Sequence, residues 1–139
     1  MSCVFCAIVE GAVDAPVVFD EPEVVGILDA RPVFKGHVLV MPRAHVPTLL
    51  DVSPELMPVL MGAAQRVAAA VVDGLGAQGS FVAMNNVVSQ SVPHLHVHVV
   101  PRTKGDGLRG FFWPRTRSAD ADEATAYAAR LRSALAPPP

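Results

Sequence analysis

Apolar residues along this chain fall into short runs separated by turn-forming residues. Runs of this length, bounded by Gly, Pro, Asp or Asn, are typical of strands. The first two runs, "PVVFD" and "EVVGILDA", are broken only by "EPE", which predicts two adjacent strands joined by a turn. In all, the pattern predicts strands over residues 16–20, 23–30, 36–45, 79–86 and 94–102.

Two longer segments have the pattern of helices. Ser53 provides an N-cap with Pro54 at the first helical position, and apolar residues then recur at helical spacing until Gly74 and Gly76. Residues 119–136 are rich in alanine, acidic at the start and basic near the end, which matches the helix dipole. Strands linked by short turns, together with two helices, predict an α+β fold with a largely antiparallel sheet.

Length and composition indicate one globular domain. The chain has 139 residues, of which 51% are hydrophobic and 17% charged, whereas disordered chains combine low hydrophobicity with high net charge. We expect a single domain over residues 1–139, with a core at 3–102, an irregular segment at 103–118 and a helix at 119–136.

The sequence gives no sign of a membrane or secretory protein. No apolar run approaches the roughly 20 residues that span a bilayer. The N-terminus "MSCVFCAIVEG" has an acidic residue where a signal peptide has a basic leader and a long apolar stretch. We therefore expect a cytoplasmic protein with no membrane partner.

Charge is uneven along the chain. The net charge is −2, but residues 102–117 carry five basic residues against the single acidic Asp106. This segment can face an anion. The chain lacks the clustered stacking aromatic residues on a sheet face that single-strand binders use, so a nucleic-acid partner is not the expectation.

Three of the five histidines alternate with apolar residues in "HLHVHVV". Side chains alternate faces along a strand, so His94, His96 and His98 share one face, about 6 to 7 Å apart, and the intervening Leu and Val face the core. The alternative is a solvated face that happens to use histidine. Such faces normally mix Lys, Glu and Thr, whereas this one concentrates the side chain that titrates near neutral pH.

The two cysteines, Cys3 and Cys6, form a Cys-x-x-Cys pair. In a reducing compartment this spacing indicates metal or redox chemistry before a structural disulfide. Structural zinc commonly takes two cysteines and two histidines, and His37, His45 and the three strand histidines are all candidates for the second pair. The alternative is that the cysteines are two partly buried small residues at a strand start.

Taken together, the motifs resemble the histidine triad (HIT) family. "SQSVPHLHVHVVPR" is similar to its His-φ-His-φ-His-φ-φ segment, where φ is an apolar residue, "CVFCAIVEG" to its N-terminal Cys-x-x-Cys form, and "ILDARPVFKGHVLVMPRAHV" to its aspartate-containing strand pair. The similarity covers residues 3–102. It implies the HIT fold, about five antiparallel strands with two helices, and a sheet extended across a homodimer. The chain most resembles the Hint-like branch, whose members hydrolyse adenosine phosphoramidates or dinucleoside polyphosphates.

The resemblance also implies roles for individual residues. His96 would attack the α-phosphorus of an AMP conjugate and form a nucleotidyl-histidine, and His98 would donate to the phosphate oxygens. Gln90 and Ser91 would lie beside the phosphate or leaving group, and Asp29 would bind the ribose hydroxyls. Asn85 would sit at the pocket edge, and the slot for the base would be formed by Val4, Phe5, Ile8 and Ile27. Structural Zn²⁺ would be held by Cys3, Cys6, His45 and His94, which leaves His37 with a structural role.

The chain departs from the family pattern at two places. The loop from Asn85 to Ser91 is shorter than the pattern, and Ser89 stands where glycine is usual. The segment "RTKGDGLRGFFWPRTR" has no counterpart, although Trp113 can reach a partner's pocket with Arg109 or Arg115 facing a leaving phosphate. Two functions from different classes follow: a nucleotide hydrolase or transferase, and a non-catalytic purine-nucleotide-binding protein. The intact triad with Ser91 favours the enzyme.

Overall fold

The computed structural model describes residues 2–108 and 116–139. It divides the chain into one unit that ends at Asp106 and a second that begins at Gly107, and the two are described separately. The prediction of one domain over 1–139 therefore stays a prediction. Arg109, Trp113 and Arg115 lie outside the described residues, so their expected roles do as well.

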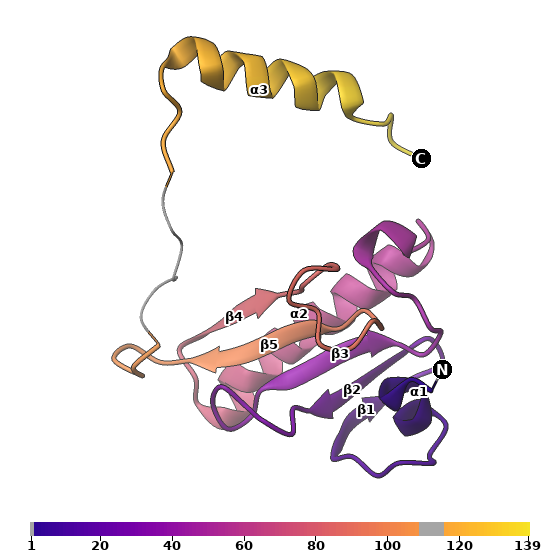
Figure 1. Ribbon diagram of the computed structural model, residues 1–139. Helices are drawn as coiled ribbons and strands as arrows, with labels where there is room; N and C mark the ends of the chain where they lie inside the picture. The colour runs from indigo at the N-terminus through magenta and orange to yellow at the C-terminus, as the bar shows by residue number, and fades with distance from the viewer. Residues whose placement is uncertain (1, 109–115) are drawn as a thin grey trace. The chain divides into compact units, whose positions relative to one another are not determined.

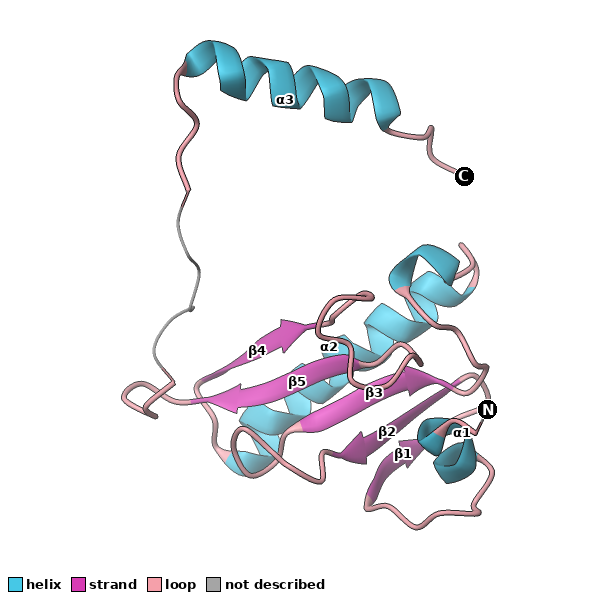
Figure 2. Cartoon of the chain, in the orientation of Figure 1, coloured by secondary structure: helices cyan, strands magenta, loops and turns pink. Residues whose placement is uncertain are grey.

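An antiparallel sheet forms the centre of the first unit. Its strands follow the spatial order β1-β2-β3-β5-β4, and each neighbouring pair is antiparallel (Figures 1 and 2). This confirms the predicted fold class. The strands are β1 (Val17–Asp20), β2 (Val24–Leu28), β3 (Val38–Pro42), β4 (Gly79–Ala83) and β5 (Val97–Arg102).

One face of the sheet is covered by α2 (Leu56–Leu75). The helix begins later than predicted, with Glu55 and not Ser53 at the N-cap position. Ser53 lies in the turn before it, where its Oγ accepts from the Leu56 N–H at 3.1 Å. The helix ends at Gly76, whose φ of 71° permits the left-handed conformation of a helix C-cap. Its apolar stripe packs on alternate residues of the central strands; the stripe comprises Leu60, Ala63, Ala64, Val67 and Val71.

By length and composition alone, α2 is apolar enough to cross a membrane, although the expectation was that no segment would be. Five of its side chains are buried against the sheet, including Leu60, which is fully enclosed, whereas Met61, Val72 and Leu75 are exposed. An apolar stripe that faces a sheet is the pattern of a core helix.

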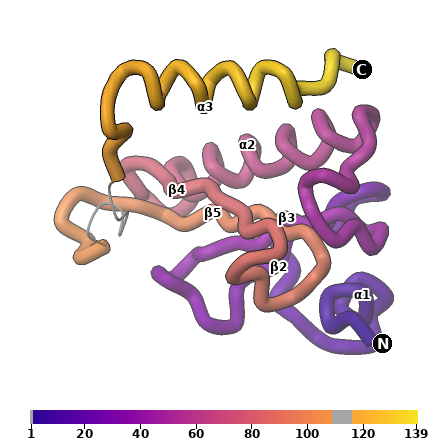
Figure 3. Tube along the Cα trace, turned by 45° about the horizontal axis from the view of Figure 1, so that its top comes forward, coloured from indigo at the N-terminus to yellow at the C-terminus, as the bar shows by residue number. Residues whose placement is uncertain are grey.

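A short helix that the sequence pattern does not predict covers part of the other face. This helix, α1 (Val4–Val9), carries Phe5 into a second apolar cluster with residues of β2 and β3, and Figure 3 shows it on the opposite side of the sheet from α2. Arg43 holds its C-terminal end, because the guanidinium donates to Val9 O at 3.4 Å and to Glu21 O at 3.0 Å. The cysteines thus lie on a helix and not at a strand start.

The second unit contains α3 (Ala121–Ala134), within the predicted helix at 119–136. Asp120 is its N-cap, with a side chain that accepts a hydrogen bond from the Glu123 N–H at 2.8 Å. Asp122 and Glu123 lie in the first turn and Arg132 in the last, as the charge pattern predicts. A single turn of 3-10 helix, Leu49–Asp51, precedes α2 in the first unit.

Replacing Gly26 with alanine is expected to destabilise the sheet. Gly26 pairs with Phe19 across β1 and β2, and a methyl group at Gly26 would collide with the Phe19 ring. Displacing a ring that packs against the main core costs about 1–3 kcal/mol of the free energy of unfolding, measured by urea denaturation.

Gly62→Ala is the matched control, because nothing lies within 4 Å of the added methyl group and the site is inside α2. Its free energy of unfolding should rise by about 0.5–1 kcal/mol through helix propensity. Equal urea midpoints for Gly26→Ala and the unmodified protein would contradict the proposed contact.

Candidate functional site

The three alternating histidines lie where β5 begins. The sequence pattern predicted a strand over residues 94–102, but the strand starts at Val97, so His94 and His96 precede it. Their alternation persists: Leu95 and the strand valines pack in the α2 cluster, and the histidines face the other side. That side is not solvated, because His94 is 0% exposed and His96 5%.

The imidazole of His96 is held in one orientation. A carbonyl oxygen can only accept a hydrogen bond, so the 2.8 Å contact between His96 Nδ1 and the His94 carbonyl places the proton on Nδ1. The Phe5 ring packs edge-on against His96, with centroids 5.0 Å apart. His96 Nε2 therefore carries a lone pair, which is the form that attacks an electrophile.

His98 carries its proton on the opposite ring nitrogen from His96. The Val33 N–H donates to His37 Nδ1 at 3.1 Å, which puts the His37 proton on Nε2. His37 Nε2 in turn donates to His98 Nδ1 at 2.9 Å, so the His98 proton lies on Nε2. With ring centroids 5.0 Å apart, His96 presents a lone pair and His98 an N–H group in the same place.

His37, expected to be structural, is thus the residue that sets the tautomer of His98. It also lies 3.6 Å from the Asp29 carboxylate, through Nε2 and Oδ2. The ligand atoms of Asp29, His37 and His98 are close enough for a metal ion. The hydrogen-bond directions oppose one, because a Nε2 that carries a proton has no lone pair for a metal.

His37 and His98 are both neutral at physiological pH. Burial, with the nearby His96 and His37, lowers the pKa of His98 from 6.5 to about 4. Burial also lowers the pKa of His37, although Asp29 opposes the shift. The site therefore offers uncharged donors and acceptors.

We expect the stability of the protein to fall as pH decreases from 6.5 to about 4. In this window the unfolded chain binds a proton at His98 and the folded protein does not, so the free energy of unfolding rises with pH. The size is about 2–3 kcal/mol for His98, with His37 acting in the same direction. Urea titrations at pH 4.5 and 7 measure it. His98→Gln should flatten the difference, and an unchanged difference would contradict burial of a neutral His98.

A second cluster brings together Cys3, Cys6, His45 and His94, the predicted zinc ligands. Cys3 Sγ is 3.5 Å from His94 Nδ1, and Cys6 Sγ is 3.4 Å from His45 Nδ1 and 3.6 Å from His94 Nδ1. A tetrahedral Zn²⁺ places its nitrogen and sulfur ligands about 3.5–3.8 Å apart. His94 Nε2 donates to Pro42 O at 2.7 Å, which leaves Nδ1 free to bind a cation. The donor set and its spacing therefore fit Zn²⁺.

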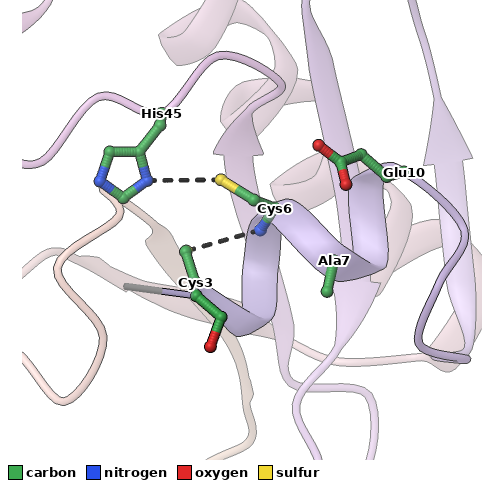
Figure 4. A pocket seen from close by; sticks show the side chains of 6 residues that line it. Cys3, Cys6, Ala7, Glu10 and His45 are labelled. Atoms are coloured by element: carbon green, nitrogen blue, oxygen red, sulfur yellow. Dashed lines mark hydrogen bonds between the residues drawn. The ribbon is translucent and has the colours of Figure 1, made fainter.

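A pocket of about 340 Å³ opens beside this cluster. Its lining includes Cys3, Cys6 and His45 together with Glu10, and Figure 4 shows these side chains around the opening. Burial and the neighbouring Cys3 raise the pKa of the Cys6 thiol. Among the four ligands only His94 is fully enclosed, so the cluster is approachable from one side.

The loop before the histidines is held by its own side chains. Gln90 Oε1 accepts from the Val87 N–H at 3.0 Å, and Gln90 Nε2 donates to Pro47 O at 2.6 Å. Both ends of this amide are engaged, so the expected role of Gln90 beside a phosphate stays a prediction. Val87 and Ser89 have φ values of 68° and 60°, a left-handed conformation that costs non-glycine residues energy.

The neighbouring residues of this loop differ in what they contact. Asn86, which the sequence reasoning did not select, accepts a hydrogen bond from the Leu49 N–H at 2.7 Å. The expected site residues Asn85 and Ser91 are exposed, and their roles stay predictions. The only feature of the sequence that could have pointed to Asn86 is its position next to the expected site residue Asn85.

Most of the expected nucleotide-binding residues lie on the α1 side of the sheet. Phe5 and Ile27 are buried in the same cluster, with Ile8 packed against it, and Val4 is 46% exposed. Asp29 follows β2, and its Oδ1 accepts from the Arg31 N–H at 2.8 Å. The structure thus places an apolar surface and a carboxylate on the histidine side of the sheet.

Comparison with protein families identifies one matching model, the HIT domain, over residues 10–105. An uncharacterised HIT-like protein, Rv1262c of Mycobacterium tuberculosis, is 37% identical over 110 residues, which are 78% of this chain and 76% of that protein. The adenosine 5'-monophosphoramidase hnt1 of Schizosaccharomyces pombe is 30% identical over 82% of this chain and 84% of its own. The adenylylsulfatase HINT3 of Arabidopsis thaliana is 30% identical over 76% of this chain and 55% of its own.

Solved structures give the same picture. A HIT family protein from Bacillus subtilis has a TM-score of 0.89 at 27% identity, covering 99% of this chain and 100% of its own. A Zn-bound histidine triad family protein from Mycobacterium smegmatis has a TM-score of 0.74 at 40% identity, covering 97% of this chain and 99% of its own. The fold and the sequence therefore both match the HIT family, and the Cys and His donor set is one that can hold a metal ion, as in the Zn-bound relative.

Proposed function

Because this chain belongs to the histidine triad (HIT) family, we propose that it cleaves an adenine nucleotide conjugate at the α-phosphate through a covalent nucleotidyl-His96 intermediate. The observation that carries this proposal is the opposite polarity of two adjacent imidazoles. His96 presents a lone pair at Nε2, and His98 presents an N–H group at Nε2. A nucleophile beside a fixed donor is what substitution at a phosphoryl group requires.

In the first step, His96 Nε2 attacks the α-phosphorus. The new P–N bond forms as the bond to the leaving group breaks, and the leaving group departs with the bonding electron pair. The positive charge that develops on the imidazole is stabilised by the His94 carbonyl, which already accepts from Nδ1 at 2.8 Å. His98 donates to a non-bridging phosphate oxygen, where negative charge is concentrated.

In the second step, water attacks the same phosphorus, the P–N bond breaks with its electron pair returning to Nε2, the proton that water loses passes to solvent, and His96 leaves as a neutral imidazole. AMP is released, and the tautomers held by the His94 carbonyl and by His37 are restored. If another nucleophile takes the place of water, the product is a transferred nucleotidyl group. The proposal therefore covers a hydrolase and a transferase with one intermediate.

The nucleotide is recognised beside the histidines. The Asp29 carboxylate, already oriented by the Arg31 N–H, accepts from the ribose hydroxyls. The base lies against the exposed Val4 of α1, beside the apolar cluster that holds the buried Phe5 and Ile27. Both features act on the nucleoside half of the substrate, so neither selects the leaving group.

Zn²⁺ would support this arrangement without taking part in the reaction. Held by Cys3, Cys6, His45 and His94, it would supply structural cross-linking, because a four-ligand tetrahedral site has no open position for substrate. We infer that the protein acts in the cytoplasm as a homodimer, on a small-molecule substrate. A single chain supplies both imidazoles of the proposed reaction.

The test is intact-mass spectrometry of the protein mixed with an adenosine phosphoramidate, a dinucleoside polyphosphate or ADP. Quenching in alkaline denaturant preserves the P–N bond, which acid breaks. We expect a mass increase equal to AMP with at least one substrate, and release of AMP over time. AMP binding without turnover and without an adduct would instead indicate a nucleotide-binding protein. If no substrate is turned over or leaves an adduct, the catalytic proposal is wrong.

A further inference from the structure

We propose that Cys3 and Cys6 are a hydroperoxide-sensitive thiol pair whose oxidation releases the metal and loosens the nucleotide site through α1. The effect on the nucleotide rests on the function proposed above, whereas the oxidation and the loosening of α1 do not. Three features carry the inference: an open pocket at the thiols, the Cys-x-x-Cys spacing, and direct packing of α1 on His96.

The pocket gives a small oxidant access to both sulfur atoms. Both cysteines line it and are partly exposed, and His45, also in the lining, is exposed. The remaining ligand, His94, is buried behind them. A closed structural zinc site shields its sulfur ligands, whereas this one presents them to a pocket of about 340 Å³. A hydroperoxide is small enough to enter.

The spacing of the thiols allows them to form a disulfide. Cys3 is the N-cap of α1 and Cys6 lies one turn later, with its N–H 3.5 Å from Cys3 Sγ. Their sulfur atoms lie within 4.8 Å of each other. This is the same sequence spacing that is oxidised and reduced reversibly in thioredoxin-like proteins.

The chemistry needs one equivalent of hydroperoxide. One thiolate attacks the terminal peroxide oxygen, the O–O bond breaks, and a sulfenic acid and an alkoxide form; the alkoxide takes a proton. The second thiolate attacks the sulfenic sulfur, the S–S bond forms, and hydroxide leaves and is protonated to water. Two sulfur atoms are oxidised and one O–O bond is reduced. Two imidazoles remain as ligands, too few to retain Zn²⁺.

Loss of the metal is transmitted by α1. This helix is six residues long, and Phe5, its one buried residue, lies between the two cysteines. The Phe5 ring contacts His94 and His96 edge-on, with centroids at 5.9 Å and 5.0 Å. Arg43 holds the C-terminal end of the helix, at Val9 O. The N-terminal end carries both cysteines of the cluster, so loss of the metal removes its link to His45 and His94 and weakens the packing of Phe5 on His96, although β2 and β3 still contact Phe5.

The experiment exposes the zinc-loaded, full-length protein to hydrogen peroxide. We expect loss of two thiols, release of one zinc ion per chain, and faster hydrogen exchange in α1 than in α2. AMP affinity, measured by calorimetry, should fall about tenfold because the base loses the α1 surface. A dithiol reductant together with Zn²⁺ should restore all four readouts. Zinc retained after both thiols are lost, or unchanged exchange in α1 after release, would overturn the proposal.

Two controls separate the causes. A chelator applied to reduced protein should loosen α1 equally, and Zn²⁺ alone should reverse it. The Cys3→Ser/Cys6→Ser protein should show no further change with peroxide, which excludes methionine oxidation as the cause. If reduced protein does not bind AMP, the proposed function fails while zinc release and α1 exchange still decide the switch. If it binds AMP equally before and after oxidation, the switch fails and the function stands.

Discussion

The His96→Ala protein is expected to lose turnover by about 10⁴-fold or more and to form no AMP adduct. His96 Nε2 is the lone pair that the hydrogen bond to the His94 carbonyl leaves exposed toward substrate. Removing a covalent nucleophile costs rates of this order because the two-step route is lost entirely. The measurement is kcat for the most active substrate of the panel, together with the intact mass after a single turnover.

His98→Ala is the matched control for this result. It removes the neighbouring donor and keeps the nucleophile, so the adduct should still form, about 10²–10³-fold more slowly. Zinc content and urea midpoint should show that both variants fold. An AMP adduct on His96→Ala would assign the nucleophile to another residue and would contradict the proposed mechanism.

The Cys6→Ser protein is expected to bind little zinc and to lose about 4 kcal/mol of the free energy of unfolding. Cys6 Sγ contacts the imidazoles of both His45 and His94, so it joins three segments of the chain. A metal that binds only the folded state at a thousand times its dissociation constant stabilises by about this amount. For a domain of this size the melting temperature should fall by about 10–20 °C.

Glu10→Gln is the control for the zinc result, because Glu10 lines the same pocket but is outside the four-ligand cluster. Its zinc content and melting temperature should match those of the unmodified protein. Equal zinc content and stability in Cys6→Ser would show that the cluster does not bind the metal. Elemental analysis and calorimetry supply both measurements.

Much of the sheet was predictable because its signal is local. Short apolar runs bounded by turn formers identified each strand, and the extended stripe of α2 identified the helix that covers them. The pairing of β3 with β5 was not predictable in this way, since they are separated by α2 and β4. This pairing depends on the edge of β3 that is not occupied by β2, which is a feature of the whole sheet and not of either strand's own sequence.

The short helix α1 escaped prediction for a physical reason. Six residues are too few to show helical periodicity, and an isolated helix of this length is unstable without packing. Phe5 is buried only because β2 and β3 supply its contacts. The cysteine spacing drew attention to the segment, but not to its conformation.

The sequence by itself determined which residue types are present and in what order: an alternating histidine strand, a Cys-x-x-Cys pair and a family resemblance. The resemblance implied different roles for the three histidines, and only the tertiary structure showed which contacts hold the rings of His96 and His98. The His94 carbonyl accepts the Nδ1 proton of His96, whereas His37, 61 residues away in sequence, donates to His98 Nδ1 and leaves the His98 proton on Nε2. The direction of each hydrogen bond depends on the group that lies opposite the ring. The carbonyl opposite His96 Nδ1 is only two residues away, but His37 reaches His98 through a contact between distant segments, which no local pattern encodes.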